Sequence, residues 1–481
     1  MSSTVQNELQ LTPHQQEVLG VVLRNIASKN TVSALVGFAG CGKTTLIKEI
    51  AAKCGLPVLS LAPTHKAADV LSSKTGREAS TIHAALGLSP DPENATGFKK
   101  SGKVKLPRNH LIVLDESSMV LRELLDMLHE VAMTLGCKIL LVGDVAQLPP
   151  VRGVGGVVFE QWVMERSGLQ SIARLEEIIR QEEGSAVPEV AFAYRDKTAD
   201  FAMPTESVIR PKGSVFLTDF NAGVSEYVDQ RTSGDIDDND RVFLSFTNQR
   251  VNMVNQLCRE RLFGPAAMAQ PFFPNELVIA ASSKQPDKDG PGIHNQQHAR
   301  VISCQSSTII AGDLHADVWG VTLELIDTGE TVTCVASDYE TRAQILRGSG
   351  KKAQELEHRF RIGMKAKGVS SEWHQIKNKQ HEAFVSFAKH HNLPDSAIRL
   401  DARRRAAWRH HHDIQNTIID LRPPYALTVH KSQGSTFRDV WLDGSSISRA
   451  SMRTALMYTG LTRASQHVYL LIDDLSSDWS Q

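Results

Sequence analysis

The chain has few cysteines, no excess of charge of either sign and no long hydrophobic run. Its six cysteines lie far apart and form no C-x-x-C pair, which argues against a zinc ribbon and a disulfide scaffold. The 53 Lys and Arg residues nearly match the 54 Asp and Glu residues, so no global charge marks a nucleic-acid binder. The apolar runs are strand-sized, and no charged-then-apolar leader opens the chain. These absences predict a soluble protein of a reducing cytoplasm.

At 481 residues the chain is too long for one core, so two large domains, or one with insertions, are expected. Short apolar runs alternate in the first third with helix-length amphipathic segments, such as residues 66–73 and 122–135. The runs span residues 34–36, 58–61, 111–114 and 139–142. This alternation is typical of βαβ units in a parallel sheet.

Residues 37–44, Gly-Phe-Ala-Gly-Cys-Gly-Lys-Thr, form a complete phosphate loop (G-x-x-x-x-G-K-[ST]) after a short apolar run. Its glycines let backbone N–H groups turn towards phosphates, Lys43 places a positive charge at the β- and γ-phosphate oxygens, and the Thr44 hydroxyl ligates Mg²⁺. The motif predicts binding of a nucleoside triphosphate with Mg²⁺. The residues expected to contact it are Gly37, Ala39, Gly40, Cys41, Gly42, Lys43, Thr44 and Thr45.

Polar side chains follow two further strand-like runs. Asp115 and Glu116 come directly after residues 111–114, at the carboxyl end where ligands sit in such sheets. We expect Asp115 to hold Mg²⁺ through water and Glu116 to orient or deprotonate the attacking water. After residues 139–142, the Gln147 amide is available to sense a γ-phosphate, although a plain strand-ending turn has the same pattern.

The remaining chain contains two insertions and a second strand series. Residues 86–110 are turn-rich and predict an insertion that projects from the first sheet. Runs at residues 242–246, 440–442 and 468–472 predict a second α/β domain. Between them lie Val/Ile/Thr-rich runs at 277–280, 300–303 and 321–326, followed by a polar helical stretch over 338–413, which predict a small β-domain with a helical extension.

The phosphate loop and eight further motifs, in order across nearly the whole chain, resemble those of superfamily 1 helicases. They are Leu11-Thr12-Pro13-His14-Gln15, the phosphate loop, Ala62-Pro63-Thr64-His65-Lys66-Ala67-Ala68 with Ser80-Thr81-Ile82-His83, Asp115-Glu116-Ser117-Ser118-Met119, Gly143-Asp144-Val145-Ala146-Gln147, Glu177-Ile178-Ile179-Arg180-Gln181, Thr428-Val429-His430-Lys431-Ser432-Gln433-Gly434-Ser435 and Tyr458-Thr459-Gly460-Leu461-Thr462-Arg463-Ala464. The Pro-Thr-His, Ser-Thr-Ile-His and His-Lys-Ser-Gln-Gly variants are most similar to the RecD, Pif1 and phage Dda group, superfamily 1B. The compact length favours its Dda-like members.

The resemblance implies an α/β fold with two RecA-like parallel-sheet domains. It implies a hairpin insertion in the first domain, and an SH3-like β plus helical insertion in the second. The expected bounds are 1–85 and 111–168 for domain 1A, 86–110 for the pin insertion 1B, 169–280 and 420–481 for domain 2A, and 281–419 for insertion 2B.

The resemblance also implies an ATP-dependent DNA helicase that moves 5′ to 3′ on single-stranded DNA, with ATP and Mg²⁺ as cofactors. Expected partners are single-stranded and forked duplex DNA and, in replication or recombination, single-strand-binding or replication proteins; a cytoplasmic monomer is expected. Two alternatives stay open. One is an RNA helicase or RNP remodeller, because the sequence contains no clear reader of the 2′-hydroxyl. The other is an ATPase switch that does not translocate, although Glu116, Gln147, Arg180 and Arg463 are all present.

The resemblance further assigns roles that spacing alone does not give. Arg180 and Arg463 match arginines that reach the γ-phosphate and stabilise its charge during transfer. Gln15 matches the adenine-reading glutamine, and Gln433 with Gly434 matches the position that couples nucleotide and strand, where an ordinary loop amide is the alternative. The implied single-strand track consists of Pro63, Thr64, His65, Thr81, His83, Phe98 and His430.

Three features of this chain have open interpretations. Phe98, flanked by Gly97 and two lysines, is expected near the tip of the 86–110 insertion, either as a duplex-splitting wedge or as a hairpin packing residue. Residues 341–415 carry 16 Lys or Arg against 7 Asp or Glu, which predicts either a solvated helical face or a phosphate-contacting surface. The consecutive His410, His411 and His412 cannot all face one ion on a helix, so we predict no metal site there.

Overall fold

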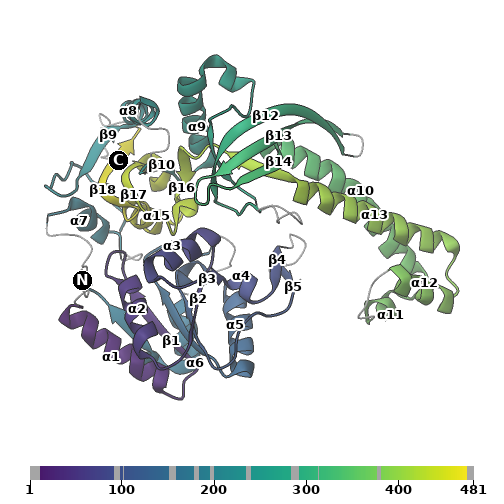
Figure 1. Cartoon of the computed structure of the whole chain (residues 1–481), viewed down its shortest axis with the longest axis horizontal. Helices are drawn as coiled ribbons and strands as arrows, with labels where there is room; N and C mark the ends of the chain where they lie inside the picture. The colour runs from purple at the N-terminus through teal and green to yellow at the C-terminus, as the bar shows by residue number, and fades with distance from the viewer. Residues whose placement is uncertain are drawn as a thin grey trace, which may run out of the picture. The chain divides into compact units, whose positions relative to one another are not determined.

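The computed structural model describes residues 11–90, 98–100, 102–150, 159–177, 184–195, 200–233, 240–282, 292–311, 314–337, 339–375 and 381–473. The chain divides into two compact units, drawn in Figure 1. The first unit comprises residues 1–258 and 425–481, and the second comprises residues 259–424. In the described residues no helix is long and apolar enough to cross a membrane.

The first unit contains a six-stranded sheet in the order β3-β2-β6-β7-β1-β8, in which all neighbouring strands are parallel. The strands are β1 (Val32–Gly37), β2 (Val58–Ala62), β3 (Ala79–Thr81), β6 (Leu111–Leu114), β7 (Lys138–Gly143) and β8 (Ile172–Leu175). The helices are α1 (Pro13–Ala27), α2 (Lys43–Lys53), α3 (His65–Thr75), α4 (Ile82–Ala85), α5 (Arg122–Leu135) and α6 (Phe159–Ser167). Leu35 belongs to the apolar core with α1, α2 and α3, whereas its neighbours Ala34 and Val36 belong to the core with α5 and α6. Both faces are therefore buried, which explains the uninterrupted apolar runs in the sequence.

A second sheet in the same unit has five parallel strands in the order β16-β10-β17-β18-β9. They are β9 (Val215–Asp219), β10 (Arg241–Ser245), β16 (Ala426–Thr428), β17 (Phe437–Asp443) and β18 (Ala464–Ile472). The accompanying helices are α7 (Ala186–Phe192), α8 (Phe220–Ser233), α9 (Asn248–Phe263), α14 (Gly444–Ser448) and α15 (Arg453–Leu461). Two parallel sheets with helices confirm the predicted α/β class.

The strands of these sheets that sequence analysis did not single out lie at the edges. Within the described residues, β3 and β8 end the first sheet, and β16 and β9 end the second. Edge strands are short or only half covered, so their apolar signal is weaker than that of central strands. β8 pairs with β1, so the first sheet takes in residues beyond 168, the bound predicted for domain 1A.

The predicted insertion after the first three strands contains a short antiparallel hairpin. β4 (Leu88–Pro90) pairs with β5 (Phe98–Lys100), and the connecting residues 91–97 lie outside the described part. Phe98 begins β5 opposite Pro90, so its backbone belongs to a strand instead of the connection. The side chain of Phe98 lies outside the described part of the structure.

The second unit is a five-stranded closed barrel with a helical extension. The barrel is formed by β11 (Leu277–Ala280), β12 (His298–Ala311), β13 (Leu314–Leu325), β14 (Thr331–Ser337) and β15 (Ile418–Arg422). Between β14 and β15 come α10 (Tyr339–Ala366), α11 (Ser370–Gln375), α12 (His381–His390) and α13 (Asp395–Thr417). β11 pairs antiparallel with β12 and β15, so the unit begins before residue 281, the bound predicted for insertion 2B. That the barrel is SH3-like stays a prediction.

Candidate functional site

A cavity of about 410 Å³ lies at the carboxyl edge of the first sheet. Residues of the phosphate loop, of the segments after β6 and β7, and of the segments before β17 and after α15 line it together. The predicted site residues that line the cavity are Gln15, Ala39, Gly40, Gly42, Lys43, Thr44, Thr45, Asp115, Glu116, Gln147, Gly434 and Arg463. The structure thus gathers residues that lie more than four hundred positions apart in the sequence.

The phosphate loop turns sharply between β1 and α2. Gly40 and Gly42 have φ angles of 84° and 88°, a left-handed conformation that side chains disfavour. The loop also packs tightly, because a Cβ atom at Gly37 would lie 2.6 Å from the Cys41 sulfur. Cys41 is buried and, like Gly37, lies behind the cavity instead of lining it. The loop is therefore a backbone cradle with little side-chain volume.

Lys43 begins α2 and is held by the loop itself. Its Nζ donates hydrogen bonds to the carbonyl oxygens of Gly37 and Phe38, at 2.8 and 2.9 Å. Burial lowers the pKa of the ammonium, but the surrounding groups, with Cys41 and Asp144 foremost, outweigh burial and hold that pKa above its ordinary value. Lys43 is accordingly a fixed positive charge at the cavity.

Asp115 and Glu116 are half-buried carboxylates that come directly after β6. Burial, followed by the charge of Glu116, raises the pKa of Asp115 to about 6. Glu116 has a φ of 49°, a left-handed backbone that is unusual for a residue with a long side chain. Its Oε2 atom is buried without a hydrogen-bond partner. An unpaired buried carboxylate oxygen at a cavity wall is available to a substrate.

The segment after β7 connects the two sheets. Asp144 is fully buried and accepts hydrogen bonds from the Ala146 N–H at 3.0 Å and the Tyr458 hydroxyl at 2.8 Å. The same Tyr458 oxygen accepts the Ala39 N–H of the phosphate loop at 3.2 Å. Tyr458 lies on α15, so one hydroxyl of the second sheet's helix joins two motifs of the first sheet. Burial and then Asp144 raise the pKa of Tyr458, which keeps the hydroxyl protonated.

Arg463 and Gln433 occupy the side of the cavity that belongs to the second sheet. Arg463 is buried, and its guanidinium donates to the carbonyl oxygens of Thr459 and Ser435, both at 3.1 Å. Gln433 does not line the cavity; its amide donates to the carbonyl oxygen of Leu148 at 3.3 Å. Gln433 therefore contacts the segment after β7 directly, and its nucleotide role stays a prediction.

Gln15 supports the phosphate loop from α1. It forms a capping box with Thr12 at the start of the helix, with both hydrogen bonds at 3.2 Å. Its amide also donates to the carbonyl oxygen of Cys41 at 3.4 Å. This position at the cavity wall is compatible with the predicted contact to a base.

Arg180 lies outside the described residues, so its predicted role stays untested. Sequence reasoning assigned no role to Tyr458, to Lys74 on α3, which lines the cavity, or to Arg195, whose guanidinium lies 3.1 Å from the ring centroid of Phe38. Tyr458 could have been found as the first residue of the last motif. Lys74 and Arg195 belong to no motif, so only tertiary structure reveals them.

The predicted strand-binding residues have mixed environments. Thr64 and Thr81 accept hydrogen bonds from Ala67 and Ala84 N–H groups and thereby cap α3 and α4. Burial, and then the charge of His65, lowers the pKa of His83. Burial also lowers the pKa of His430, whose ring lies 6.4 Å from that of Phe246. Pro63 lies between β2 and α3. These residues stay predictions for DNA contact.

The cavity suits Mg²⁺ bound together with phosphates. Mg²⁺ prefers oxygen ligands and is usually bound by one or two carboxylates with substrate phosphates and water. Thr44 and Asp115 supply such oxygens at the cavity wall, and Glu116 lies beside them. Among the described residues, no group of three or more His, Cys, Asp or Glu side chains is placed so that it could hold a metal ion. His410 to His412 form no such group either.

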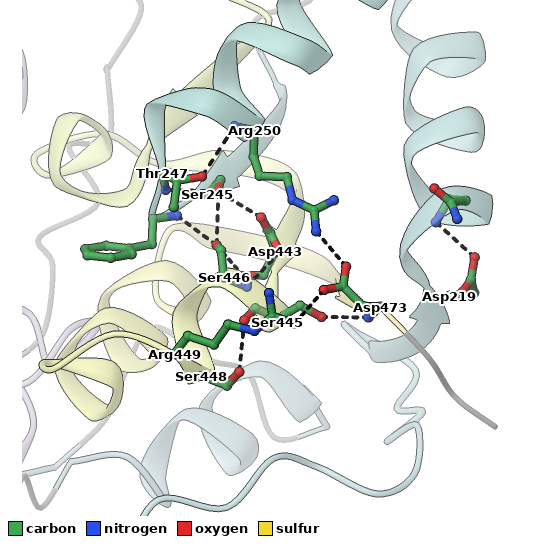
Figure 2. A network of polar contacts seen from close by, with 12 residues as sticks. Asp219, Ser245, Thr247, Arg250, Asp443, Ser445, Ser446, Ser448, Arg449 and Asp473 are labelled. Atoms are coloured by element: carbon green, nitrogen blue, oxygen red, sulfur yellow. Dashed lines mark hydrogen bonds and ion pairs between the residues drawn. The ribbon is translucent and has the colours of Figure 1, made fainter. Parts of the chain in front are cut away.

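At the carboxyl edge of the second sheet, unlike that of the first, the polar side chains are paired with one another. Figure 2 shows a polar network there, in which the fully buried Asp443 accepts hydrogen bonds from the Ser245 hydroxyl at 2.8 Å and the Ser446 N–H at 3.0 Å. Asp473, which follows β18, pairs with Arg250 at 2.7 Å and with Arg449 at 3.1 Å. These groups satisfy one another.

Comparison with known proteins adds two domain matches and several relatives. Residues 10–206 match the AAA domain family, and residues 423–471 match the UvrD-like helicase C-terminal domain. The chain is 24% identical over 482 residues to the ATP-dependent DNA helicase dda of Enterobacteria phage T4, covering 95% of this chain and 98% of that protein. It is 41% identical over 133 residues to the ATP-dependent RecD2 DNA helicase of Deinococcus radiodurans. This alignment covers 27% of this chain and 18% of that protein.

The fold is also similar to a solved structure. The crystal structure of Pif1 helicase from Bacteroides in complex with ADP-AlF3 and ssDNA superimposes with a TM-score of 0.50 at 16% identity, covering 96% of this chain and 92% of that chain. This likeness supports the assignment of both parallel sheets as RecA-like domains. By its ordered motifs and its two matched domains, this chain is similar to the superfamily 1B helicases Dda and RecD2, and it shares its fold with Pif1.

Proposed function

We propose that this protein is an ATP-dependent DNA helicase that moves 5′ to 3′ along single-stranded DNA and separates duplex ahead of it. The main support for the proposal is that residues from both RecA-like sheets line one cavity. A nucleotide bound there touches both sheets at once, so its hydrolysis changes the contacts between them.

The residues around the cavity have complementary tasks in hydrolysis. Water attacks the γ-phosphorus, the bond to the β–γ bridging oxygen breaks, and ADP and phosphate result. We assign the proton of the attacking water to the unpaired Oε2 of Glu116. Lys43 and Arg463 stabilise the negative charge on the phosphate oxygens. Thr44 and Asp115 would hold Mg²⁺, which would further neutralise that charge.

Three contacts transmit the state of the cavity between the sheets. Tyr458 joins the Ala39 N–H to Asp144, and the Gln433 amide donates to Leu148. The Leu148 N–H in turn donates to the Thr459 hydroxyl at 3.2 Å. Each contact connects the phosphate loop or the segment after β7 to a motif of the second sheet. Phosphate bound at the loop competes for the Ala39 N–H and so changes these contacts.

The test is unwinding of a duplex with either a 5′ or a 3′ single-stranded DNA tail, with ATP and Mg²⁺. We expect only the 5′-tailed substrate to open, and we expect Lys43→Ala to abolish opening. Lys48→Ala is the matched control, because Lys48 is exposed on the same helix and does not line the cavity. Opening of the 3′-tailed substrate alone would overturn the proposed direction.

The same substrates separate the alternatives. Matched RNA strands that stimulate ATP hydrolysis more than DNA would favour an RNA helicase or RNP remodeller. Hydrolysis without opening of either tail would favour a switch that does not translocate.

A further inference from the structure

The helical extension of the second unit contains a hollow that none of the motifs explains. Helices α10 and α13 run side by side (Figure 1), and a hollow of about 540 Å³ lies between them. Its polar lining includes Lys352 and Arg359 from α10, and Arg403 and His410 from α13. Glu355 is the acidic residue among the lining side chains.

The register of the two helices places these basic residues in two opposed pairs. Ser349 contacts His411 at 2.8 Å and Glu357 contacts Arg404 at 2.6 Å, so the helices are antiparallel. In that register, Lys352 lies opposite His410, and Arg359 lies opposite Arg403. Each helix contributes residues seven positions apart, which lie on one face about 10 Å apart at a rise of 1.5 Å per residue.

Other arginines of the same helices are neutralised by acidic partners. Arg404 contacts Glu357 and Asp401, and Arg405 contacts Asp401 at 2.6 Å. Although burial raises the pKa of Asp401, hydrogen bonds from Arg405, His381 and Arg404 outweigh it and hold that pKa below its ordinary value. On this side of the helix pair, the arginine charges are therefore neutralised by carboxylates.

The hollow side lacks such partners. Within the described part of the chain, Lys352, Arg359 and Arg403 form no hydrogen bond or ion pair. They also form no ion pair with Glu355, which lines the same hollow. All three are exposed. Three permanent cations against one carboxylate leave the hollow positively charged even when His410 is neutral. Unpaired, exposed Lys and Arg side chains in a concave surface are suited to phosphate groups.

We propose that the hollow between α10 and α13 binds the phosphate backbone of duplex DNA. The inference rests on the proposed function in that a DNA helicase meets duplex ahead of the strand it tracks. The lining favours duplex over single-stranded DNA, because no described residue of the hollow is Phe, Tyr or Trp, and single-strand sites hold bases by stacking on such side chains. Contacts of this kind carry no sequence preference.

The test is duplex binding by a variant that carries Lys352→Gln, Arg359→Gln and Arg403→Gln. The affinity of the full chain for a blunt DNA duplex is measured without nucleotide at several salt concentrations. Each lost phosphate contact makes the negative slope of log affinity against log salt shallower by about 0.9, so the loss of three contacts makes it shallower by roughly 2.7. The affinity for a short single strand, and the ATP hydrolysis that this strand stimulates, should stay unchanged.

A matched control has the same charge change on the same two helices. Lys351→Gln, Arg399→Gln and Arg409→Gln remove three exposed cations that lie outside the hollow. We expect this variant to keep most of the salt dependence of duplex binding. An equal loss in both variants would show a general charge effect and overturn the hollow as a site.

Two other outcomes would also overturn the proposal. If single-strand affinity falls as much as duplex affinity, the hollow belongs to the strand track. If the variant keeps duplex binding but loses binding of polyglutamate, the hollow accepts an acidic peptide instead. Failure of the proposed function is distinguishable, because it shows as absent unwinding by the unmodified protein, whereas the duplex-binding measurement requires no ATP.

Discussion

The two parallel sheets of the first unit differ at their carboxyl edges. At the edge of the first sheet, Glu116 has a buried oxygen without a partner, beside a cavity of about 410 Å³. At the edge of the second, Asp443 is fully buried, and the Ser245 hydroxyl and the Ser446 N–H bind both of its oxygens (Figure 2). One edge holds carboxylates available to a ligand, and the other holds a carboxylate used for structure.

The difference arises from the segments that follow the strands. After β1 comes a glycine-rich loop, whereas β17 is followed directly by the short helix α14, whose Ser446 N–H binds Asp443. The same sheet architecture therefore supports a site at one edge and a closed network at the other. The second sheet contributes to the cavity through residues such as Gly434 and Arg463 instead of through its own carboxyl edge.

The largest effect is expected at Glu116. Glu116→Gln keeps the shape of the side chain but removes the proton acceptor, so kcat for ATP hydrolysis should fall by roughly 10²–10⁴-fold. Nucleotide affinity, measured by fluorescence of a labelled ATP analogue, should change little. Glu123→Gln, an exposed residue on α5, is the control. A kcat close to that of the parent would remove Glu116 from the catalytic role.

A change at Asp443 should lower stability and leave catalysis nearly unchanged. Asp443→Ala leaves the Ser446 N–H and the Ser245 hydroxyl without their carboxylate partner and should cost about 2 kcal/mol of stability. That corresponds to a Tm lower by roughly 4–8 °C. ATP hydrolysis per folded molecule, measured well below Tm, should stay near that of the parent. A large loss of kcat with unchanged Tm would mean that the two edges do not differ as described.

Tyr458 tests whether the first edge depends on the second sheet. Tyr458→Phe removes the hydroxyl that joins the Ala39 N–H to Asp144 and should change ATP hydrolysis by about fivefold, the equivalent of about 1 kcal/mol. Tyr227→Phe is the matched control, because the hydroxyl of this buried tyrosine donates to the Tyr425 carbonyl away from the cavity. Both variants should lose thermal stability, but only Tyr458→Phe should change hydrolysis. Equal hydrolysis rates in the two variants would argue against coupling through Tyr458.

The smallest effect concerns the pH dependence of stability in the protein without nucleotide or Mg²⁺. The pKa of Asp115 is raised from 3.8 to about 6, so its carboxyl group favours folding at low pH, and this contribution is lost as the pH rises through 6. Asp115→Asn removes the buried charge. The Tm of this variant relative to the parent should therefore rise by a few degrees between pH 4 and pH 7, measured by scanning fluorimetry in EDTA. A difference in Tm that is independent of pH would contradict the raised pKa.

Sequence patterns predicted the central strands of both sheets and missed the edges. The apolar runs at 111–114 and 139–142 match β6 and β7, because both faces of a central strand are buried. The strands β3, β8, β9 and β16 gave no comparable signal, since an edge strand is short or partly exposed. The helix over 122–135 was predicted with its observed bounds, because Leu124, Leu125 and Leu128 repeat with helical spacing.

By itself the sequence predicted the residues of the first sheet's edge that line the cavity, because these parts of the candidate nucleotide site are contiguous. A phosphate loop needs glycines, Lys43 and Thr44 within eight residues, and the paired carboxylates need only one strand before them. Tertiary structure decided which distant residues complete the site. Tyr458 and Asp144 are 314 positions apart, and Gln433 and Leu148 are 285 apart. No local pattern encodes such contacts, because they join segments of two different sheets that are far apart in the sequence.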